Sequence, residues 1–210
     1  MKKFELTTES ITNEAGKKLF RIKALIDFGD VKAGELGGYV EKEENVSQAD
    51  NAWVSGDAEV FGNARVYGDA KVYGNARVCG NAKVYGNAKV YGNARVYGDA
   101  RVCGDAWVSG NAWVSGNAMV SGNARVSGNA RAYGDADYAL VQGFGTEFRC
   151  TTFYRGKNKK IMVNCGCFHG DLEEFRKQVK ETRSGKIAKE YLMIADLMKY
   201  HFASEDSSDE

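Results

Sequence analysis

The sequence is dominated by one six-residue word, Gly-(Asn/Asp)-Ala-x-Val-(Tyr/Ser/Cys), which repeats through residues 51–133 almost without interruption. Glycine stands at every sixth position from Gly56 to Gly134, and valine does so from Val54 to Val126. A short and strict period indicates one structural unit stacked on copies of itself. Because only x and the residue after valine vary freely, a ligand would have to be recognised at those two positions.

The spacing within the word predicts both a strand and a turn. Alanine and valine are two residues apart, so on an extended strand they share one side while x points to the other. Gly-Asn and Gly-Asp favour turns, because glycine adopts positive φ without strain and Asn or Asp tolerates it. Three words per coil give a triangular parallel β-solenoid, in which residues eighteen apart stack at roughly 4.8 Å. Only alanine and valine would fill its interior.

The repeat resembles that of the hexapeptide-repeat proteins, which fold into a left-handed parallel β-helix. Their word is aliphatic-Gly-x-x-small-x, whereas here glycine follows the aliphatic residue by two positions. Residues 27–34 (DFGDVKAG) and 37–41 (GGYVE) are also similar to the N-terminal segment of bacterial and phage members that are labelled transferases from their fold. The resemblance implies a left-handed coil, although the crossover rule for parallel strands favours the other hand. It also implies trimers, which are common in such proteins.

The segments around the repeat predict a cap at each end, because open strand edges otherwise pair with other chains. Residues 1–50 are expected to form an N-terminal β cap with short strands at 4–7 and 19–22. The solenoid is expected to span 51–137. An acidic tail, 204–210, closes the chain, and its composition predicts disorder.

Residues 138–203 are expected to form a small ββαα unit. Its strands are placed at 147–154 and 160–164, as a hairpin. Asp171 with glutamate three residues later predicts the start of one helix, and a second helix is expected from Lys186. A unit of this size buries only a small core, so we expect it to dock on the rod or on a partner.

Composition limits the class of protein. The formal net charge is +1, and no apolar run reaches membrane-spanning length or resembles a signal core at the N-terminus. Five cysteines, an odd number spread along the chain, do not indicate a disulfide framework. These features predict a reduced, cytoplasmic protein without a membrane partner, and the phage resemblance makes that compartment the cytosol of a bacterial host.

Two kinds of chemistry are weighed against the fold. Acetyl-CoA-dependent acyl transfer needs a general base, but the repeat holds no histidine, and His201 is expected only to end a helix. Cys150, Cys165, Cys167 and His169 could supply three thiolates and an imidazole to zinc. Their C-x-C-x-H spacing is tighter than usual, and buried inert thiols are the alternative. We expect no catalytic residues and no cofactor other than this possible zinc.

The outer surface of the rod supplies the remaining candidates. Residues at position x that are eighteen apart stack on one face, so the cations form columns beside columns of tyrosine. Such a surface could bind phosphates and bases. The alternative is a solvated surface in which each cation lies over a neighbouring ring. The candidate anion- or nucleotide-binding residues are Arg65, Tyr67, Lys71, Tyr73, Arg77, Lys83, Tyr85, Lys89, Tyr91, Arg95, Tyr97 and Arg101.

One coil carries large apolar residues at x on three successive faces, namely Trp107, Trp113 and Met119. Three exposed apolar side chains around one coil predict a contact, either with the C-terminal unit or with another chain. The sequence therefore favours a non-catalytic binding module of phage type that self-associates, with a trimer favoured, or binds a host protein. Nucleotide or nucleic-acid binding on the tyrosine–cation faces is the first alternative, and acyl transfer is the second.

Overall fold

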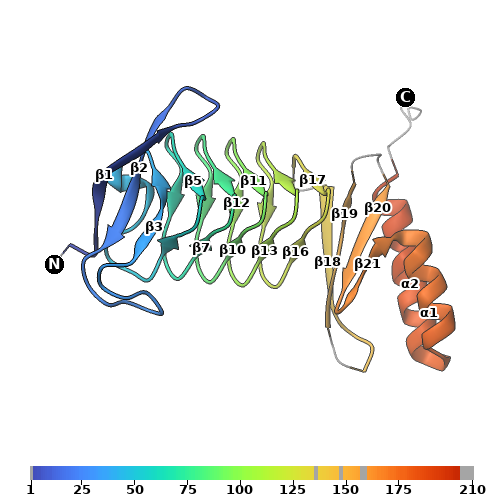
Figure 1. Ribbon diagram of the computed structural model, residues 1–210. Helices are drawn as coiled ribbons and strands as arrows, with labels where there is room; N and C mark the ends of the chain where they lie inside the picture. The colour runs from blue at the N-terminus through green and yellow to red at the C-terminus, as the bar shows by residue number, and fades with distance from the viewer. Residues whose placement is uncertain (1, 135–136, 147–148, 157–159, 204–210) are drawn as a thin grey trace.

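The computed structural model of the chain describes residues 2–134, 137–146, 149–156 and 160–203, and the predicted acidic tail lies outside them. The described part is a rod of stacked coils with a different cap at each end (Figure 1). Strands β1 to β3 lie at the N-terminal end, and a sheet followed by two helices lies at the C-terminal end. The fold is mainly β, as the repeat predicts.

The rod is a parallel β-solenoid whose strands are two residues long and begin with x. Each strand from β4 to β14 pairs in parallel with the strand eighteen residues further on, as Lys71 does with Lys89. The strands are β4 (Trp53–Val54), β5 (Glu59–Val60), β6 (Arg65–Val66), β7 (Lys71–Val72), β8 (Arg77–Val78), β9 (Lys83–Val84), β10 (Lys89–Val90), β11 (Arg95–Val96), β12 (Arg101–Val102), β13 (Trp107–Val108), β14 (Trp113–Val114), β15 (Met119–Val120), β16 (Arg125–Val126) and β17 (Arg131–Ala132). The predicted three words per coil are confirmed, while the hand of the coil stays a prediction from the resemblance.

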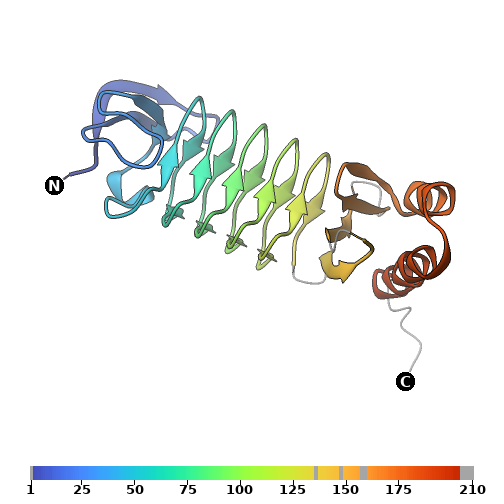
Figure 2. The same cartoon turned by 90° about the horizontal axis from the view of Figure 1, so that it is seen from below.

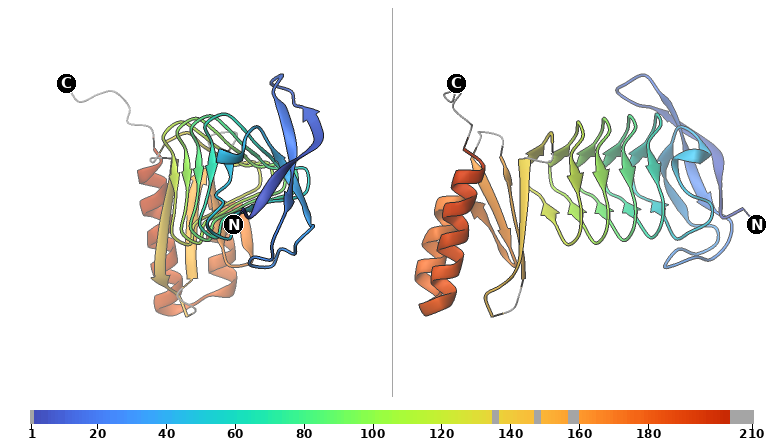
Figure 3. Two further views of the ribbon diagram at one scale, coloured as in Figure 1. Left: turned by 90° about the vertical axis from the view of Figure 1, so that its left-hand side faces the viewer. Right: turned by 180° about the vertical axis from the view of Figure 1, so that it is seen from behind.

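Parallel pairing sorts these strands into three faces of a prism. Face 1 contains β4, β7, β10, β13 and β16, face 2 contains β5, β8, β11, β14 and β17, and face 3 contains β6, β9, β12 and β15. Viewed along the rod, the coils superimpose (Figure 3). Each face therefore presents one straight column of x side chains on its outer side.

The interior and the corners of the prism explain why glycine, alanine and valine recur so regularly in the repeat. The alanines and valines of the repeat are completely or almost completely buried, so they form the core that the pattern predicts. The corner glycines from Gly56 to Gly128 all have φ between 60° and 73°. The turn asparagines form ladders along the corners, in which the side chain of Asn75 donates to Asn93 at 3.3 Å and Asn93 donates to Asn111 at 3.2 Å. The polar side chains of the corners thus bond to the neighbouring coil.

The N-terminal cap is an antiparallel hairpin that leads into the first coil. β1 (Phe4–Thr12) pairs with β2 (Lys18–Ala24), and β2 pairs with β3 (Leu36–Val40). A short 3-10 helix, η1 (Glu43–Asn45), comes next in the chain. The hairpin projects to one side of the rod (Figure 3).

Coil stacking begins earlier than the repeat indicates. β3 pairs in parallel with β5, so the first layer contains residues that the sequence assigns to the cap. The reason is a close approach: a Cβ on Gly37 would lie 2.6 Å from the Val54 carbonyl oxygen, and one on Gly38 would lie 2.7 Å from that of Ala58. Glycine in both positions lets a segment without the repeated word stack on the solenoid.

The solenoid has a polarity, and side chains satisfy its first coil. In each coil the N–H of x donates to the alanine carbonyl of the next coil at 2.8–3.0 Å, so the first coil presents carbonyl groups with no coil before them. The Lys3 Nζ donates to the backbone carbonyl oxygen of Asp50 at 2.7 Å and to that of Ala52 at 2.8 Å. Asn45 donates through Nδ2 to the Ala64 oxygen at 2.9 Å. Buried donors therefore close the N-terminal end.

Lys3 gives a testable pH dependence. Burial lowers the pKa of Lys3 to about 8, and the Asp50 carboxylate offsets part of that shift. Between about pH 8 and the ordinary value of 10.5 the unfolded chain keeps a proton that the native chain has lost, so the unfolding free energy should rise with pH in that window. Below about pH 8 Lys3 is protonated in both states, so it does not change the unfolding free energy with pH. A neutral amine still donates both hydrogen bonds.

We expect Lys3→Met to remove this rise and to lower stability by about 1–3 kcal/mol, because one buried and one partly buried carbonyl group lose their donor. Urea titrations at several pH values on both sides of that window measure both effects. Lys2→Met is the matched control, since Lys2 is an exposed lysine on the same segment. An equal pH slope in Lys3→Met and the unchanged protein would contradict the assignment.

The C-terminal unit is a four-stranded antiparallel sheet with two helices on one side (Figure 2). Its elements are β18 (Tyr138–Phe144), β19 (Arg149–Arg155), β20 (Ile161–Cys165), β21 (Phe168–Asp171), α1 (Leu172–Thr182) and α2 (Gly185–His201). The predicted ββαα unit lacks β18 and β21, because Gly143 and Gly170 interrupt the alternation that marks a strand. The predicted capping box is present, since Asp171 accepts from the Glu174 N–H at 2.9 Å. Neither described α-helix is long and apolar enough to cross a membrane.

One face of the C-terminal sheet takes the place of the coil that would come after β17. Tyr154 is completely buried in the solenoid core, and its hydroxyl donates to the Ser127 carbonyl oxygen at 3.1 Å. Thr152 accepts the Arg125 N–H through Oγ1 at 3.1 Å, and Asn164 donates through Nδ2 to the Arg125 oxygen at 2.8 Å. The predicted docking of this unit on the rod is confirmed.

Candidate ligand-binding surfaces

The structure places the predicted anion-binding residues in straight columns on the outside of the rod. Lys71 and Lys89 are neighbours on face 1, and Arg77 and Arg95 are neighbours on face 2. Face 3 carries Arg65, Lys83 and Arg101. Two tyrosine pairs, Tyr67–Tyr85 and Tyr73–Tyr91, stack with ring centroids 4.9 Å apart and an interplanar angle of 1°. Tyr97 stands at the corresponding place in the word on face 2.

On faces 1 and 2 the first cation of the column is neutralised by the N-terminal cap. Lys71 forms an ion pair with Asp30. Arg77 pairs with Glu14, at the tip of the β1–β2 hairpin, and with Glu59 at 3.4 Å. These two cations hold the cap on the rod, so they are not free to bind a ligand.

Further toward the C-terminal end of faces 1 and 2, cations lie on both sides of the tryptophans of the predicted apolar coil. The distances from cation to ring centroid are 5.1 Å (Lys89) and 4.5 Å (Arg125) for Trp107, and 5.3 Å (Arg95) and 4.6 Å (Arg131) for Trp113. Both tryptophans are half-buried, whereas Met119 on face 3 is 38 % exposed. Two of the three predicted interface side chains therefore already pack within the chain, and the predicted interface stays a prediction.

Face 3 differs because its cations keep their charge unpaired. Arg65, Lys83 and Arg101 are exposed in three successive layers. None of the three has a carboxylate partner within 4 Å among the residues that the structure describes. Of the three faces, this one retains an uninterrupted cationic column in the described part of the chain.

A groove opens at the N-terminal end of face 3, and we call it the cap groove. It has a volume of about 570 Å³. Arg65, Tyr67 and Lys83 line it from the solenoid, and Ser47 and Gln48 line it from the segment after η1. Glu43 and Glu44 of η1 also line it, so two carboxylates share the groove with the cations. Tyr85 covers one face of the Tyr67 ring, while the position eighteen residues before Tyr67 is an alanine, so the other ring face borders the groove. An aromatic ring and a cationic column therefore meet at one place.

The predicted zinc ligands are not brought together. Cys165 packs against the core between the sheet and the helices, whereas Cys150 lies on the solenoid side of the sheet and Cys167 is exposed in the turn before β21. The His169 Nδ1 lies 2.5 Å from the Asn164 Oδ1. Within the described ranges, no three His, Cys, Asp or Glu side chains are placed to hold a metal ion. Alternation along the strands sends Cys150 and Cys165 to opposite faces of the sheet.

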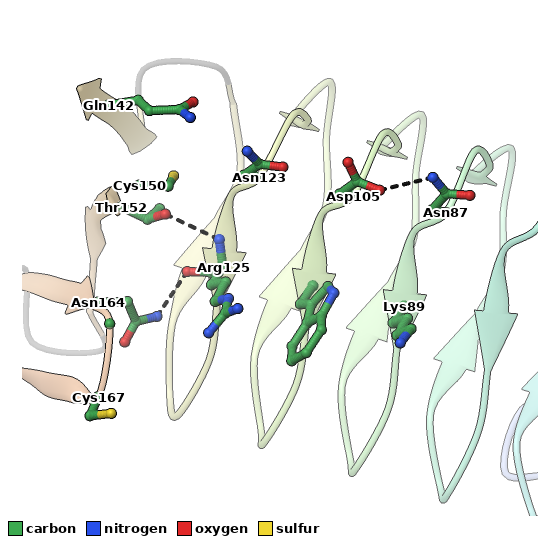
Figure 4. A pocket seen from close by; sticks show the side chains of 12 residues that line it. Asn87, Lys89, Asp105, Asn123, Arg125, Gln142, Cys150, Thr152, Asn164 and Cys167 are labelled. Atoms are coloured by element: carbon green, nitrogen blue, oxygen red, sulfur yellow. Dashed lines mark hydrogen bonds between the residues drawn. The ribbon is translucent and has the colours of Figure 1, made fainter. Parts of the chain in front are cut away.

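A second groove lies where face 1 meets the C-terminal sheet, and we call it the junction groove (Figure 4). Its volume is about 720 Å³. The floor is formed by side chains of face 1 and its corner, and the wall by side chains of the C-terminal sheet. The floor residues are Asn87, Lys89, Asp105, Trp107, Asn123 and Arg125, and the wall residues include Gln142, Cys150, Thr152, Asn164 and Cys167.

The sequence does not reveal this groove as a unit. Lys89, Trp107, Cys150 and Cys167 are candidates, but for three different sites, and the wall depends on where the C-terminal sheet docks. One signal is available in the sequence: Lys89, Trp107 and Arg125 are eighteen residues apart, so they have to stack on one face.

Comparison with known proteins gives a partial match. A family model described as the YdcK beta solenoid repeat matches residues 88–104, 100–116 and 112–128. Successive matches are shifted by two words, and each spans almost one coil. The chain is therefore similar to that family over part of its solenoid. No curated protein matches the chain significantly.

Proposed function

We propose that the protein is a non-catalytic binding module that holds single-stranded nucleic acid along face 3. The observation that carries this proposal is the column of Arg65, Lys83 and Arg101, exposed and unpaired beside the stacked rings of Tyr67 and Tyr85. Proteins that bind single strands without sequence preference combine a positively charged groove with aromatic rings on which bases stack. Face 3 offers both in one line.

Electrostatics favours an anionic ligand on this face. Two cations one strand spacing apart repel by roughly 0.9 kcal/mol even in water, and the middle cation of three has two such neighbours. On faces 1 and 2 carboxylates or tryptophans offset this cost. On face 3 no carboxylate of the described chain lies within ion-pair distance of the column, although Glu43 and Glu44 line the groove at its N-terminal end. A phosphate chain along Lys83 and Arg101 would offset the repulsion there.

The ring of Tyr67 favours nucleic acid over a plain polyanion. Its free face borders the cap groove, whose volume of about 570 Å³ admits a base. Burial raises the pKa of the Tyr67 hydroxyl, so the ring stays neutral at physiological pH. A base stacked there would have its phosphates next to Arg65 and Lys83.

Other functions have less support. Self-association through Trp107, Trp113 and Met119, as a trimer or with a host protein, is disfavoured because cations already cover the two tryptophans. Acyl transfer would need a base, and both histidines lie in the C-terminal unit, where His169 contacts Asn164 and Tyr154. The proposal therefore assigns no catalytic residue and no cofactor.

The test is binding of a fluorescein-labelled oligo-dT, long enough to span the column, measured by anisotropy at several salt concentrations. Lys83→Gln/Arg101→Gln should weaken binding about tenfold or more and reduce the salt slope by about 1.4, because two phosphate contacts are lost. Lys186→Gln/Lys189→Gln, on the exposed side of α2, removes the same charge elsewhere and should leave the affinity nearly unchanged.

Tyr67→Leu separates nucleic acid from other polyanions. The loss of one base stack should weaken oligo-dT binding by about 1–3 kcal/mol, while binding of inorganic polyphosphate should stay unchanged. Equal affinity of the unchanged protein and Lys83→Gln/Arg101→Gln for oligo-dT would overturn the proposal. So would an equal loss in the α2 control.

A further inference from the structure

The junction groove is a second, independent place where the chain presents unpaired charge. Lys89 and Arg125 both line it, and neither has a carboxylate within ion-pair distance among the described residues. They lie on opposite faces of the Trp107 ring, at 5.1 and 4.5 Å from its centroid. The indole thus fixes the two cations at a set separation and is not itself available for stacking.

That separation limits what the cations can bind. They belong to strands β10 and β16, two layers apart, which corresponds to roughly 9–10 Å along the rod. One phosphate cannot contact both heads at hydrogen-bond distance. A ligand that engages both must carry two or more anionic groups along its length.

The wall of the groove is held rigidly relative to Arg125. Thr152 and Asn164 bind the backbone N–H and carbonyl of Arg125, and Asn164 also donates to the Ser127 hydroxyl at 3.1 Å. The same contacts that cap the solenoid therefore position the wall opposite the floor. Figure 4 shows Thr152 and Asn164 beside Arg125, with these two hydrogen bonds to its backbone drawn as dashed lines.

Other polar side chains of the junction groove have hydrogen-bonding groups that no described residue uses. The side chains of Gln142 and Asn123 make no hydrogen bond with other residues in the described part of the chain, and both line the groove. The Asp105 Oδ1 accepts from Asn87 at 2.9 Å, which leaves the second carboxylate oxygen for a donor on a ligand. Two amides and a carboxylate oxygen in the same groove as two cations suit a molecule that has hydroxyl or amino groups as well as phosphates.

We propose that the junction groove is a binding site for a small molecule with two or more phosphate groups. Lys89 and Arg125 bind its phosphates at two points, and Asn123, Gln142 and Asp105 bind its neutral polar groups. The volume of about 720 Å³ lies within the range of small-ligand sites. This site shares no residue with face 3, so it stands whether or not face 3 binds nucleic acid.

The experiment is calorimetric titration of the full chain with ATP and, separately, with inorganic tripolyphosphate, while tryptophan fluorescence is followed. Lys89→Gln/Arg125→Gln should weaken binding about tenfold or more, since both phosphate contacts are lost. The matched control is Arg95→Gln/Arg131→Gln, because these cations enclose Trp113 with nearly the same distances. The groove beside Arg95 and Trp113 on face 2 is lined by the tip of the β1–β2 hairpin and by no residue of the C-terminal sheet. This control variant should leave the affinity nearly unchanged.

Fluorescence and a second charge variant locate the site. Trp107→Phe should abolish the ligand-dependent change in emission, and Trp113→Phe should keep it. Lys83→Gln/Arg101→Gln on face 3 should bind ATP normally. Tighter binding of ATP than of tripolyphosphate identifies the ligand as a nucleotide, and equal binding identifies the phosphate chain as the group that is recognised.

Three outcomes would overturn the inference. The first is no saturable binding of either probe at millimolar concentration. The second is an equal loss of affinity in the face 2 control. The third is a loss confined to Lys83→Gln/Arg101→Gln, which would place the ligand on face 3.

Discussion

Gly104→Ala is expected to lower the unfolding free energy by about 2–5 kcal/mol, whereas Gly122→Ala lowers it by only about 1–2 kcal/mol. Both glycines have positive φ, 67° and 61°, so each alanine incurs the same left-handed backbone strain. They differ in the neighbour that the next coil provides. A Cβ on Gly104 would lie 3.0 Å from the Gly122 nitrogen and 3.2 Å from its carbonyl oxygen, while one on Gly122 has no atom within 4 Å.

The pair therefore separates two reasons for glycine, backbone conformation and the stacking distance between coils. The neighbour of Gly104 is backbone, which cannot turn away as a flexible side chain could, so the coils would have to move apart. Urea unfolding followed by circular dichroism measures the difference. Equal destabilisation in the two variants would show that the φ requirement alone explains the period.

Tyr154→Ala is expected to cost about 3–5 kcal/mol, because a completely buried aromatic side chain leaves a cavity at the end of the solenoid core. Burial also raises the pKa of the Tyr154 hydroxyl to about 12, which agrees with its place inside the core. Tyr154→Phe should cost only about 1 kcal/mol, since it keeps the ring and loses the hydrogen bond to Ser127.

Loss of this ring should also change association. With the C-terminal sheet loosened, the last coil exposes strand edges that pair readily with other chains. Light scattering should show a higher apparent mass for Tyr154→Ala than for the unchanged protein, and no change for Tyr154→Phe. If Tyr154→Ala is as stable as Tyr154→Phe and keeps its mass, the sheet is not what closes the rod.

The repeat is sufficient to predict the solenoid, its interior and every column of x residues. This success has a physical basis, because a strict six-residue period gives every coil the same shape, so equivalent residues stack once three words complete a turn. The cation–tryptophan stacks could be predicted from the same period, since Lys89, Trp107 and Arg125 are eighteen apart. The prediction of an exposed Trp107 considers the coil alone and not the layers on either side.

Contacts between distant segments cannot be predicted in this way. The pairing of Arg77 with Glu14 depends on how the hairpin folds back over face 2. The predicted zinc set is not assembled, because the pairing of Thr151 with Cys165 fixes which cysteine faces which side, and no local rule gives that register. The junction groove depends on the same docking, so the sequence assigns its residues only to other sites.

The backbone polarity of the rod has a consequence for how its length can change. All coils point their donors the same way, so the two ends are chemically unlike and each cap fits only its own end. Removing or duplicating eighteen residues would leave both caps in their present orientation, because one full coil returns the chain to the same face of the prism. Removing six would rotate the C-terminal sheet by a third of a turn and set it above a different side of the prism. Any insertion or deletion that preserves the present juxtaposition of sheet and side must therefore come in whole turns.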